Sequence, residues 1–520
     1  MGRAAPARKE APDVPAAIEL RGIDKRFGAV HANRDVSLRV ERGTVHGIVG
    51  ENGAGKSTLM SILYGFYAPD RGEIVVNGVP THIRTPSDAI ARGIGMVHQH
   101  FMLVENFTVL ENVILGAEGG AMLNRGMASA YATLSALRQD YGLDVPAGAL
   151  VSDLPVGLQQ RVEILKALFR GAETLILDEP TGVLTPAEAT HLFTVLGQLR
   201  DQGKTVILIT HKLKEIMAIT DTVSVMRKGE LVETLPTRKT TPEKLARLMV
   251  GRNVALRVTK SRAKPAAKVL EVGNLVYRDA AGVERLKGVS FDVHAGEIVG
   301  IAGVAGNGQS ELLEVLAGIR PKTGGDIRLH GRPLSQNDCD ARRMRGERVA
   351  HVPEDRQRMG LVLPFEACEN AILGYHRAEA YGRGAFLDRG AMIADTRAKM
   401  ERYDVRPPLP ERRISLFSGG NQQKLVLARE IERDPELLIV GQPTRGVDIG
   451  AIEFIHRRLV ELRDRGKAIL LVSVELEEIR ALADRLLVMF AGTIAGERPP
   501  STSEAELSAL MAGLTAGEAA

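Results

Sequence analysis

A glycine-rich stretch near residue 50 has the residue types and the spacing that bind phosphate. The pattern G-x-x-x-x-G-K-[S/T] is met by Gly50, Gly55, Lys56 and Ser57. In this pattern backbone amides curl round a triphosphate, the lysine reaches its β and γ oxygens, and the hydroxyl can ligate Mg²⁺. Apolar residues precede the stretch and recur after it at helical spacing, which predicts a loop between a strand and a helix N-terminus, where anions bind. The predicted nucleotide-binding residues are Gly50, Glu51, Asn52, Gly53, Ala54, Gly55, Lys56, Ser57 and Thr58.

An acidic pair follows another short apolar run, at residues 174–177. Asp178 and Glu179 stand where a buried parallel strand would deliver carboxylates to a site. Asp178 would hold the water shell of Mg²⁺, and Glu179 would polarise the attacking water. Alone, such a pair is more often an ordinary strand end, and the glycine-rich loop upstream favours the catalytic interpretation.

Taken in order, these motifs resemble the ATP-binding cassette (ABC) family, and the resemblance runs from about Ile18 to Met511. It implies that Phe27 stacks on adenine, that Gln99 is the Q-loop glutamine and that His211 is the switch histidine. The implied catalytic residues are Glu179, His211 and Gln99, and the implied Mg²⁺ ligands are Ser57, Asp178 and Gln99. The cofactors are then ATP and Mg²⁺.

The second half of the sequence repeats the first. The offset is 253 residues at the P-loop, from Lys56 to Gln309, and 263 at the switch position, from His211 to Val474. The repeat has lost its catalytic residues: Gln309 replaces the lysine, Glu354 the Q-loop glutamine, Gly441 and Gln442 the acidic pair, and Val474 the histidine. Without the lysine and the water-activating carboxylate, we expect no hydrolysis there.

The family's signature loop, which caps the γ-phosphate of the opposite domain, shows the reverse distribution. The second half keeps Ser418, Gly419 and Gly420, and the later D-loop residue Asp448. In the first half Pro155 and Val156 stand at the Ser418 and Gly419 positions, and Thr185 stands at the Asp448 position. Proline offers neither a hydroxyl nor an N–H group to a phosphate. If the halves pair head to tail, the losses all fall in one composite site and leave the other complete, with Ser418, Gly419, Gly420 and Asp448 as further nucleotide-binding residues.

The predicted fold class is α/β, with two tandem ABC-type nucleotide-binding domains. The resemblance implies that each contains a P-loop core, an antiparallel β subdomain and a helical subdomain. The predicted parts are a disordered tail at 1–15, a first domain at 16–251, a linker at 252–267, a second domain at 268–511 and a disordered tail at 512–520. The first 15 residues lack the apolar segment of a secretory signal.

Composition argues against several classes of protein. The chain has 68 Lys and Arg residues against 64 Asp and Glu residues, which leaves no strong footprint for nucleic acid. No apolar run approaches the roughly 18 to 20 residues that span a bilayer. Cys339 and Cys368 lack metal-ligand spacing, which predicts a reducing location without disulfides.

Fused halves with a degenerate second site resemble the ATP-binding subunits of ribose-type sugar and nucleoside importers. The phrases VHQHFMLVENFTVLENVILG and LPVGLQQRVEILKALFRGAETLILDEPTGVLTP resemble the nucleoside branch more closely. The implied partners are two transmembrane permease subunits and, through them, a substrate-binding lipoprotein or periplasmic protein, with the chain peripheral on the cytoplasmic face of the inner membrane and no nucleic acid bound. A sugar importer stays open, as does a soluble tandem ABC protein acting on ribosomes or nucleic acid.

Overall fold

The structure is a computed structural model, and it describes residues 16–28, 30–98, 101–116, 123–182, 184, 186–253, 258–304, 306–334, 344, 346, 348–383 and 386–514. The chain divides into two compact units, Met1–Val254 and Ala255–Ala520. The division falls inside the stretch predicted to be a linker. The predicted tail at 1–15, most of the tail at 512–520, Gln99 and Thr185 lie outside the described residues.

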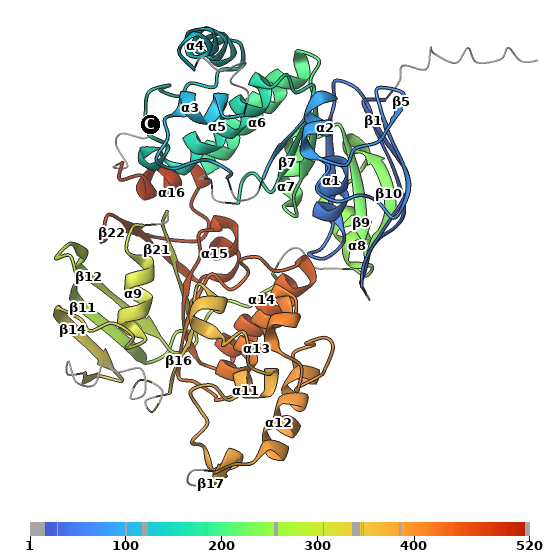
Figure 1. Cartoon of the computed structure of the whole chain (residues 1–520). Coiled ribbons are helices and arrows are strands. Elements are labelled where there is room, and N and C mark those ends of the chain that lie inside the picture. The colour runs from blue at the N-terminus through green and yellow to red at the C-terminus, as the bar shows by residue number, and fades with distance from the viewer. Residues whose placement is uncertain are drawn as a thin grey trace, which may run out of the picture. The chain divides into compact units, whose positions relative to one another are not determined.

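The first unit alternates strands and helices (Figure 1). Its strands are β1 (Ile18–Phe27), β2 (Val30–Val40), β3 (Val45–Val49), β4 (Arg71–Val76), β5 (Val79–Thr81), β6 (Ile94–Val97), β7 (Thr174–Asp178), β8 (Thr205–Ile209), β9 (Thr222–Arg227) and β10 (Glu230–Pro236). Its helices are α1 (Lys56–Leu63), α2 (Pro86–Ala91), α3 (Val109–Ile114), α4 (Leu123–Tyr141), α5 (Val156–Phe169), α6 (Pro186–Asp201), α7 (Leu213–Ile219) and α8 (Pro242–Val250), with 3₁₀ turns η1 (Val151–Asp153) and η2 (Thr237–Lys239).

Two sheets carry this unit. The larger has the order β10-β9-β3-β8-β7-β6, and its neighbours from β9 to β6 are parallel. Strands β3, β7 and β8 are buried along their whole length, as expected where both faces of a parallel sheet are covered. The smaller sheet, β2-β1-β4-β5, is antiparallel.

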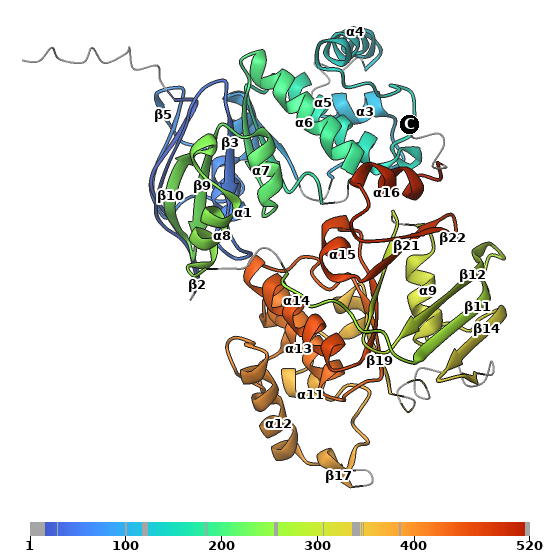
Figure 2. The same ribbon diagram turned by 180° about the vertical axis from the view of Figure 1, so that it is seen from behind.

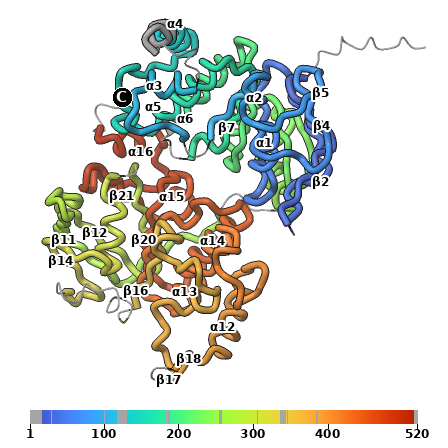
Figure 3. The backbone as a smooth tube through the Cα atoms, in the orientation of Figure 1, coloured from blue at the N-terminus to red at the C-terminus, as the bar shows by residue number. Residues whose placement is uncertain are grey.

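The helices α3, α4 and α5 form a separate part of the first unit. Helix α5 packs against both α3 and α4, and the three lie well away from the four-stranded sheet in both views (Figures 1 and 2). In sequence these helices fall between β6 and β7, and Figure 3 shows α3 and α5 beside each other. Strand β7 therefore directly follows α5, the helix that starts at the signature position.

The second unit repeats this plan. Its strands are β11 (Lys268–Arg278), β12 (Glu284–His294), β13 (Ile298–Ala302), β14 (Gly324–Leu329), β15 (Arg332–Pro333), β16 (Val349–Val352), β17 (Gly382–Arg383), β18 (Phe386–Leu387), β19 (Leu437–Gly441), β20 (Ala468–Val472), β21 (Arg485–Phe490) and β22 (Thr493–Arg498). Its helices are α9 (Gln309–Leu316), α11 (Ala367–Ala371), α12 (Arg389–Arg402), α13 (Gly419–Ile431), α14 (Ile449–Asp464), α15 (Leu476–Leu482) and α16 (Glu504–Met511), with turns η3 (Arg356–Gly360), η4 (Glu379–Tyr381) and η5 (Ile414–Leu416).

The two main sheets of each unit correspond strand for strand, and the second unit also has a two-stranded sheet, β17-β18. The second unit has an antiparallel sheet β12-β11-β14-β15 and a larger sheet β16-β19-β20-β13-β21-β22. The apolar residues of β13, β19 and β20 are all buried. The predicted α/β class, with an antiparallel β subdomain and a helical subdomain in each half, is confirmed.

Part of the predicted linker packs on the second unit. Lys260 Nζ donates hydrogen bonds to the carbonyls of Leu482, at 2.8 Å, and Ala483, at 2.6 Å. These carbonyls lie at the C-terminal end of α15, where a cation is favourable. Across the described part of the chain, no helix has the length and apolar character needed to cross a membrane.

A candidate nucleotide-binding and hydrolysis site

The loop between β3 and α1 has a backbone that only glycine adopts easily. Gly55, at the N-terminus of α1, has φ of 95°. A Cβ atom there would come within 2.3 Å of the Ala32 carbonyl oxygen, and one on Gly50 within 2.4 Å of the Met226 carbonyl oxygen. The two glycines therefore let the loop pass close to β2 and β9.

Lys56 lies inside this loop. Its side chain is only 5% exposed, and its Nζ donates to the carbonyls of Gly50, at 2.8 Å, and Glu51, at 3.0 Å. The buried Asn33 side chain donates to the Gly55 carbonyl at 3.1 Å and holds the end of the loop. A cation surrounded by loop carbonyls and amides is suited to a polyphosphate.

Asp178 and Ser57 meet beside this lysine. The Ser57 hydroxyl hydrogen-bonds the Asp178 carboxylate, because β7 and the loop after β3 end at the same edge of the sheet. Burial raises the pKa of Asp178, and the Ser57 hydrogen bond and the Lys56 charge oppose that rise. A hydroxyl and a carboxylate are oxygen ligands of the kind that Mg²⁺ takes together with phosphate oxygens, so these two residues fit the metal.

Glu179 and His211 form a hydrogen-bonded pair at the ends of β7 and β8. His211 Nδ1 lies 3.0 Å from Glu179 Oε1. The hydrogen bond from His211 is the largest influence that lowers the pKa of Glu179, with smaller contributions from Lys56 and Lys212. Glu179 has φ of 47°, and its N–H donates to the Ile209 carbonyl at 2.9 Å. The carboxylate is thus ionised and fixed in direction, as a group that orients water must be.

Motif comparison missed Glu215, which joins the two loops that carry this pair. Its buried carboxylate accepts hydrogen bonds from the hydroxyls of Thr181 and Thr210, the latter at 2.9 Å. Thr181 follows Glu179 by two residues and Thr210 precedes His211. Burial raises the pKa of Glu215, and the two hydroxyls oppose this. Only the pairing of these loops in space reveals the role, because a lone glutamate on a helix gives no signal in the sequence.

Of the two remaining first-half residues predicted to take part, only Phe27 is among the described residues. Phe27 is 42% exposed, and its ring meets Tyr67 edge to face at 5.1 Å between centroids, with Lys25 Nζ 5.5 Å from its centroid. A half-exposed aromatic face can stack on a base. Gln99 lies outside the described residues, one position after His98 at the end of β6.

The corresponding loop of the second unit keeps the shape and changes the groups. Gln309 is 6% exposed, and its amide Nε2 donates to the Val304 carbonyl at 3.2 Å. The amide therefore fills the position of the lysine ammonium without its charge. Gln442 Oε1 accepts a hydrogen bond from the Val474 N–H at 3.1 Å. Gln442 stands at the position of Glu179 and Val474 at that of His211, so a neutral hydrogen bond joins these two positions in the second unit.

The loop serine of the second unit pairs with a carboxylate from a different position in the fold. The Ser310 hydroxyl donates to Glu354, whereas Ser57 in the first unit pairs with Asp178. A Cβ on Gly441 would lie 2.5 Å from Glu354 Cγ, so the glutamate occupies the space that an aspartate at 441 would need.

The two signature positions differ in capping although their backbones agree. Ser418 caps α13 with φ of −62° and ψ of 156°, and its hydroxyl accepts from the Asn421 N–H. Pro155 caps α5 with φ of −54° and ψ of 151° and makes no side-chain hydrogen bond. Gly420 lies close to Asp448, since a Cβ on it would be 3.6 Å from Asp448 Oδ2. The predicted second-half residues thus lie together in the second unit.

The repeated fold, the loop with Lys56 and Ser57, and Asp178 at the end of β7 define a P-loop nucleotide-binding protein with two related units. The family described as ABC transporter matches residues 33–182 and 286–445, once in each unit. The chain therefore belongs to the ABC transporter family, and the resemblance expected from its motifs is confirmed.

Relatives match along nearly the whole chain. The nucleoside import ATP-binding protein NupA of Lactococcus lactis subsp. cremoris is 47% identical over 497 residues, which covers 95% of this chain and 98% of that protein. The guanosine import ATP-binding protein NupO of Bacillus subtilis is 48% identical over 503 residues, covering 96% and 98%. The glucose import ATP-binding protein TsgD13 of Haloferax volcanii is 44% identical over 519 residues, covering 94% of each.

A solved structure shares the tandem fold at lower identity. The chain resembles an archaeal ribosome recycling factor, aABCE1, solved in complex with the ribosomal stalk protein aP1, with a TM-score of 0.59 and 20% identity. The match covers 90% of this chain and 87% of that one. At this identity the likeness concerns the fold alone.

The Glu215 contacts generate a prediction. Glu215→Ala removes the acceptor shared by Thr181 and Thr210 and loosens the Glu179–His211 pair, so we expect kcat for ATP hydrolysis to fall about 10- to 100-fold, as for other groups that hold reacting residues in place. Steady-state ATPase assays measure this, with Lys214→Ala, an exposed neighbour on α7, as the control. Equal activity in the two variants would contradict the role of Glu215.

Proposed function

We propose that this chain is the ATP-hydrolysing subunit that energises a membrane importer of nucleosides. The observation that carries the proposal is full-length similarity, at 47% and 48% identity, to two nucleoside import ATP-binding proteins. The partners would be two transmembrane permease subunits, reached by a substrate-binding lipoprotein or periplasmic protein. The chain would sit peripherally on the cytoplasmic face of the cell membrane.

A sugar importer is the second candidate. It is favoured by the glucose import relative, whose 44% identity is close to that of the nucleoside proteins. The ATPase residues do not contact the transported molecule. Their similarity to either relative therefore bears on ATP hydrolysis and not on the pocket that selects the substrate. The choice rests on overall similarity.

We propose one competent ATP site, built from the first unit's loop and the second unit's signature residues. The nucleotide-binding residues are Phe27 and the loop residues Gly50 to Thr58, completed by Ser418, Gly419, Gly420 and Asp448. The supporting observation is the distribution of losses: each half lacks the groups that the other retains. The domains would be 16–251 and 268–511, joined by 252–267.

The first-unit residues divide the work of hydrolysis. Lys56 would hold the phosphate oxygens, while Ser57, Asp178 and Gln99 would hold Mg²⁺, which supplies positive charge for the transferring phosphoryl group. Glu179 would orient the attacking water and accept its proton. His211, already bound to Glu179 through Nδ1, would fix that carboxylate and steady the γ-phosphate through its other nitrogen.

Signature contacts would couple hydrolysis to movement. Ser418 and the Gly420 amide would reach the γ-phosphate only when the halves close, so closure depends on contacts that exist in one state alone. Loss of that phosphate removes the contacts and lets the halves reopen. Gln99 would report the state to the permease.

Uptake measurements in cells test which class of substrate is imported. Cells that lack this chain are expected to lose ATP-driven uptake of labelled guanosine and adenosine and to keep ribose and glucose uptake. The intact gene is expected to restore nucleoside uptake, and a Lys56→Ala copy, which cannot hold the phosphates, is not. Loss of sugar uptake with normal nucleoside uptake would favour the sugar importer instead.

Matched substitutions at one position in each half test the catalytic asymmetry. Glu179→Gln removes the carboxylate that orients water, so we expect kcat to fall about 100-fold or more and ATP to stay bound. Gln442→Ala, the control at the corresponding second-half position, is expected to leave most activity. ATPase assays and retention of labelled ATP on a gel-filtration column give both results, and a near-total loss in Gln442→Ala would contradict a silent second site.

Exchange of the signature residues tests the composite site. Ser418→Pro copies the first half and removes a phosphate donor, so we expect hydrolysis at the Lys56 loop to fall about 100-fold although the change lies in the other unit. The reciprocal Pro155→Ser is expected to leave the rate and the number of ATP molecules hydrolysed unchanged. Full activity in Ser418→Pro would show that the first unit hydrolyses ATP without the second.

A further inference from the structure

The second unit has a short insertion directly after its Q-loop position. In the first half Val104 follows Gln99 by five residues, and in the second half Val362 follows Glu354 by eight. The two valines correspond, because the N–H of each donates to the side chain of a buried asparagine, at 2.7 and 2.8 Å. The three additional residues belong to the turn η3 (Arg356–Gly360), which is π-helical, a geometry often found at functional sites.

Arg356, the first residue of η3, reaches the loop that leads to Asp448. Its Nη1 donates to the Arg445 carbonyl at 2.7 Å and its Nη2 to the Gly446 carbonyl at 3.3 Å. Two parallel donors on a planar guanidinium fix the direction of both carbonyls. Asp448, two residues further on, begins α14. The arginine therefore sets the start of the D-loop.

The same guanidinium lies against the signature loop. A Cβ atom on Gly419 would be 2.4 Å from Arg356 Nη2 and 2.9 Å from the Gly446 carbonyl oxygen. Glycine at 419 thus leaves the space that the arginine occupies. In the first half the corresponding residue is Val156, and the insertion that carries the arginine is missing. Signature glycine and arginine are present together or absent together.

Further contacts attach η3 to the signature helix α13. Gln357 Nε2 donates to Gln422 Oε1 at 3.2 Å, and Arg429 Nη1 donates to the Gly360 carbonyl at 2.7 Å. The Asp355 carboxylate accepts the first two N–H groups of the turn after Arg356, at 2.9 and 3.0 Å. The turn is thus held at both ends, which fixes the backbone position from which the Arg356 side chain extends.

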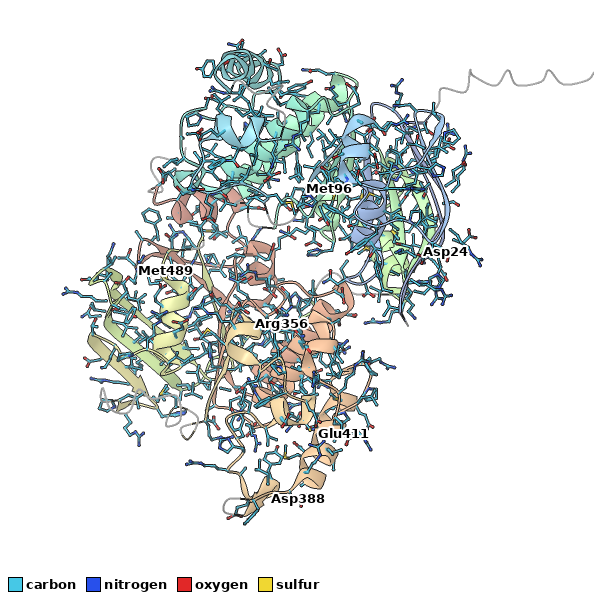
Figure 4. All side chains as sticks on the ribbon, viewed as in Figure 1. Asp24, Met96, Arg356, Asp388, Glu411 and Met489 are labelled. Atoms are coloured by element: carbon cyan, nitrogen blue, oxygen red, sulfur yellow. The ribbon has the colours of Figure 1, made fainter. Side chains whose placement is uncertain are left out.

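The environment of the Arg356 guanidinium indicates that its position is specific. Arg356 is partly exposed and lies far from Asp388, which stands at the end of the helical subdomain (Figure 4). Its Nε is buried and has no hydrogen-bond partner among the described residues, which is costly for a guanidinium. An arginine needed only for solubility or surface charge would point to water.

We infer that Arg356 is a positioning residue for ATP hydrolysis: it joins the Ser418–Gly420 loop to the Arg445–Asp448 loop so that both present one rigid surface to the γ-phosphate. The inference rests on the proposed composite site. Arg356 itself touches loop carbonyls and the signature backbone, and it acts on the phosphate through Ser418, Gly420 and Asp448.

Substitutions of Arg356 in the full-length chain test the inference. Arg356→Ala removes both carbonyl contacts and is expected to lower kcat about 10- to 100-fold, the effect of a small displacement of reacting groups, with KM for ATP and the melting temperature little changed. Arg356→Lys keeps the charge but has one donor nitrogen in place of the two that reach the carbonyls, and it is expected to recover part of kcat. Arg358→Ala, an exposed arginine in the same turn, is the control and is expected to match wild type.

A second comparison separates this inference from the proposed function. In a Ser418→Pro background, Arg356→Ala is expected to cause little further loss, because both changes impair the same surface. If Ser418→Pro lowers kcat and Arg356→Ala does not, the role of Arg356 is wrong and the composite site stands. If neither variant lowers kcat, both fail. If Arg356→Ala raises KM or lowers the melting temperature without changing kcat, or if Arg356→Lys recovers no kcat, the residue is merely structural and the inference is overturned.

Discussion

The site depends on the adjacency of three parallel strands. Strands β3, β8 and β7 are neighbours in the larger sheet of the first unit, and each ends in a loop with a different task. The loop after β3 carries Lys56, β7 ends at Asp178, and β8 leads to His211. Because parallel strands bring their carboxyl ends to one edge, groups more than 100 residues apart in sequence meet within hydrogen-bond distance. The buried strands make that edge rigid.

The second unit has the same scaffold with different chemical groups at the strand ends. Its strands β13, β20 and β19 have the same neighbours, and its glycine-rich loop still leads into a helix. The changes are chemical: an amide replaces the ammonium, and Gln442 forms a neutral contact where Glu179 and His211 form a charged one. The carboxylate of Glu354 takes up the space left by Gly441. Packing has been preserved while the charges needed for phosphoryl transfer have been removed.

The sequence was sufficient for the fold and for the residues with strong local patterns. The loop at 50–58 and the strand ending at Asp178 combine an apolar run with a fixed motif, so their placement follows from local sequence. Glu215 and Arg356 could not be found in this way. Each acts through backbone or hydroxyl groups of two separate loops, and the spacing between those loops depends on tertiary packing. Gln99 and Thr185 are predicted by motif position and lie outside the described residues.

The retained loop of the second unit has a structural reason to persist. The Asn307 side chain donates to the Met489 carbonyl at 3.3 Å and accepts from the Ala491 N–H at 3.2 Å, which ties the loop to the turn between β21 and β22. Deleting the loop would expose the end of β13 and leave these backbone groups without partners, at a cost for each. The Gln309 amide donates a hydrogen bond to a loop carbonyl, as the lysine does in the first unit. The loop therefore has a structural role in the second unit that is separate from any role in hydrolysis.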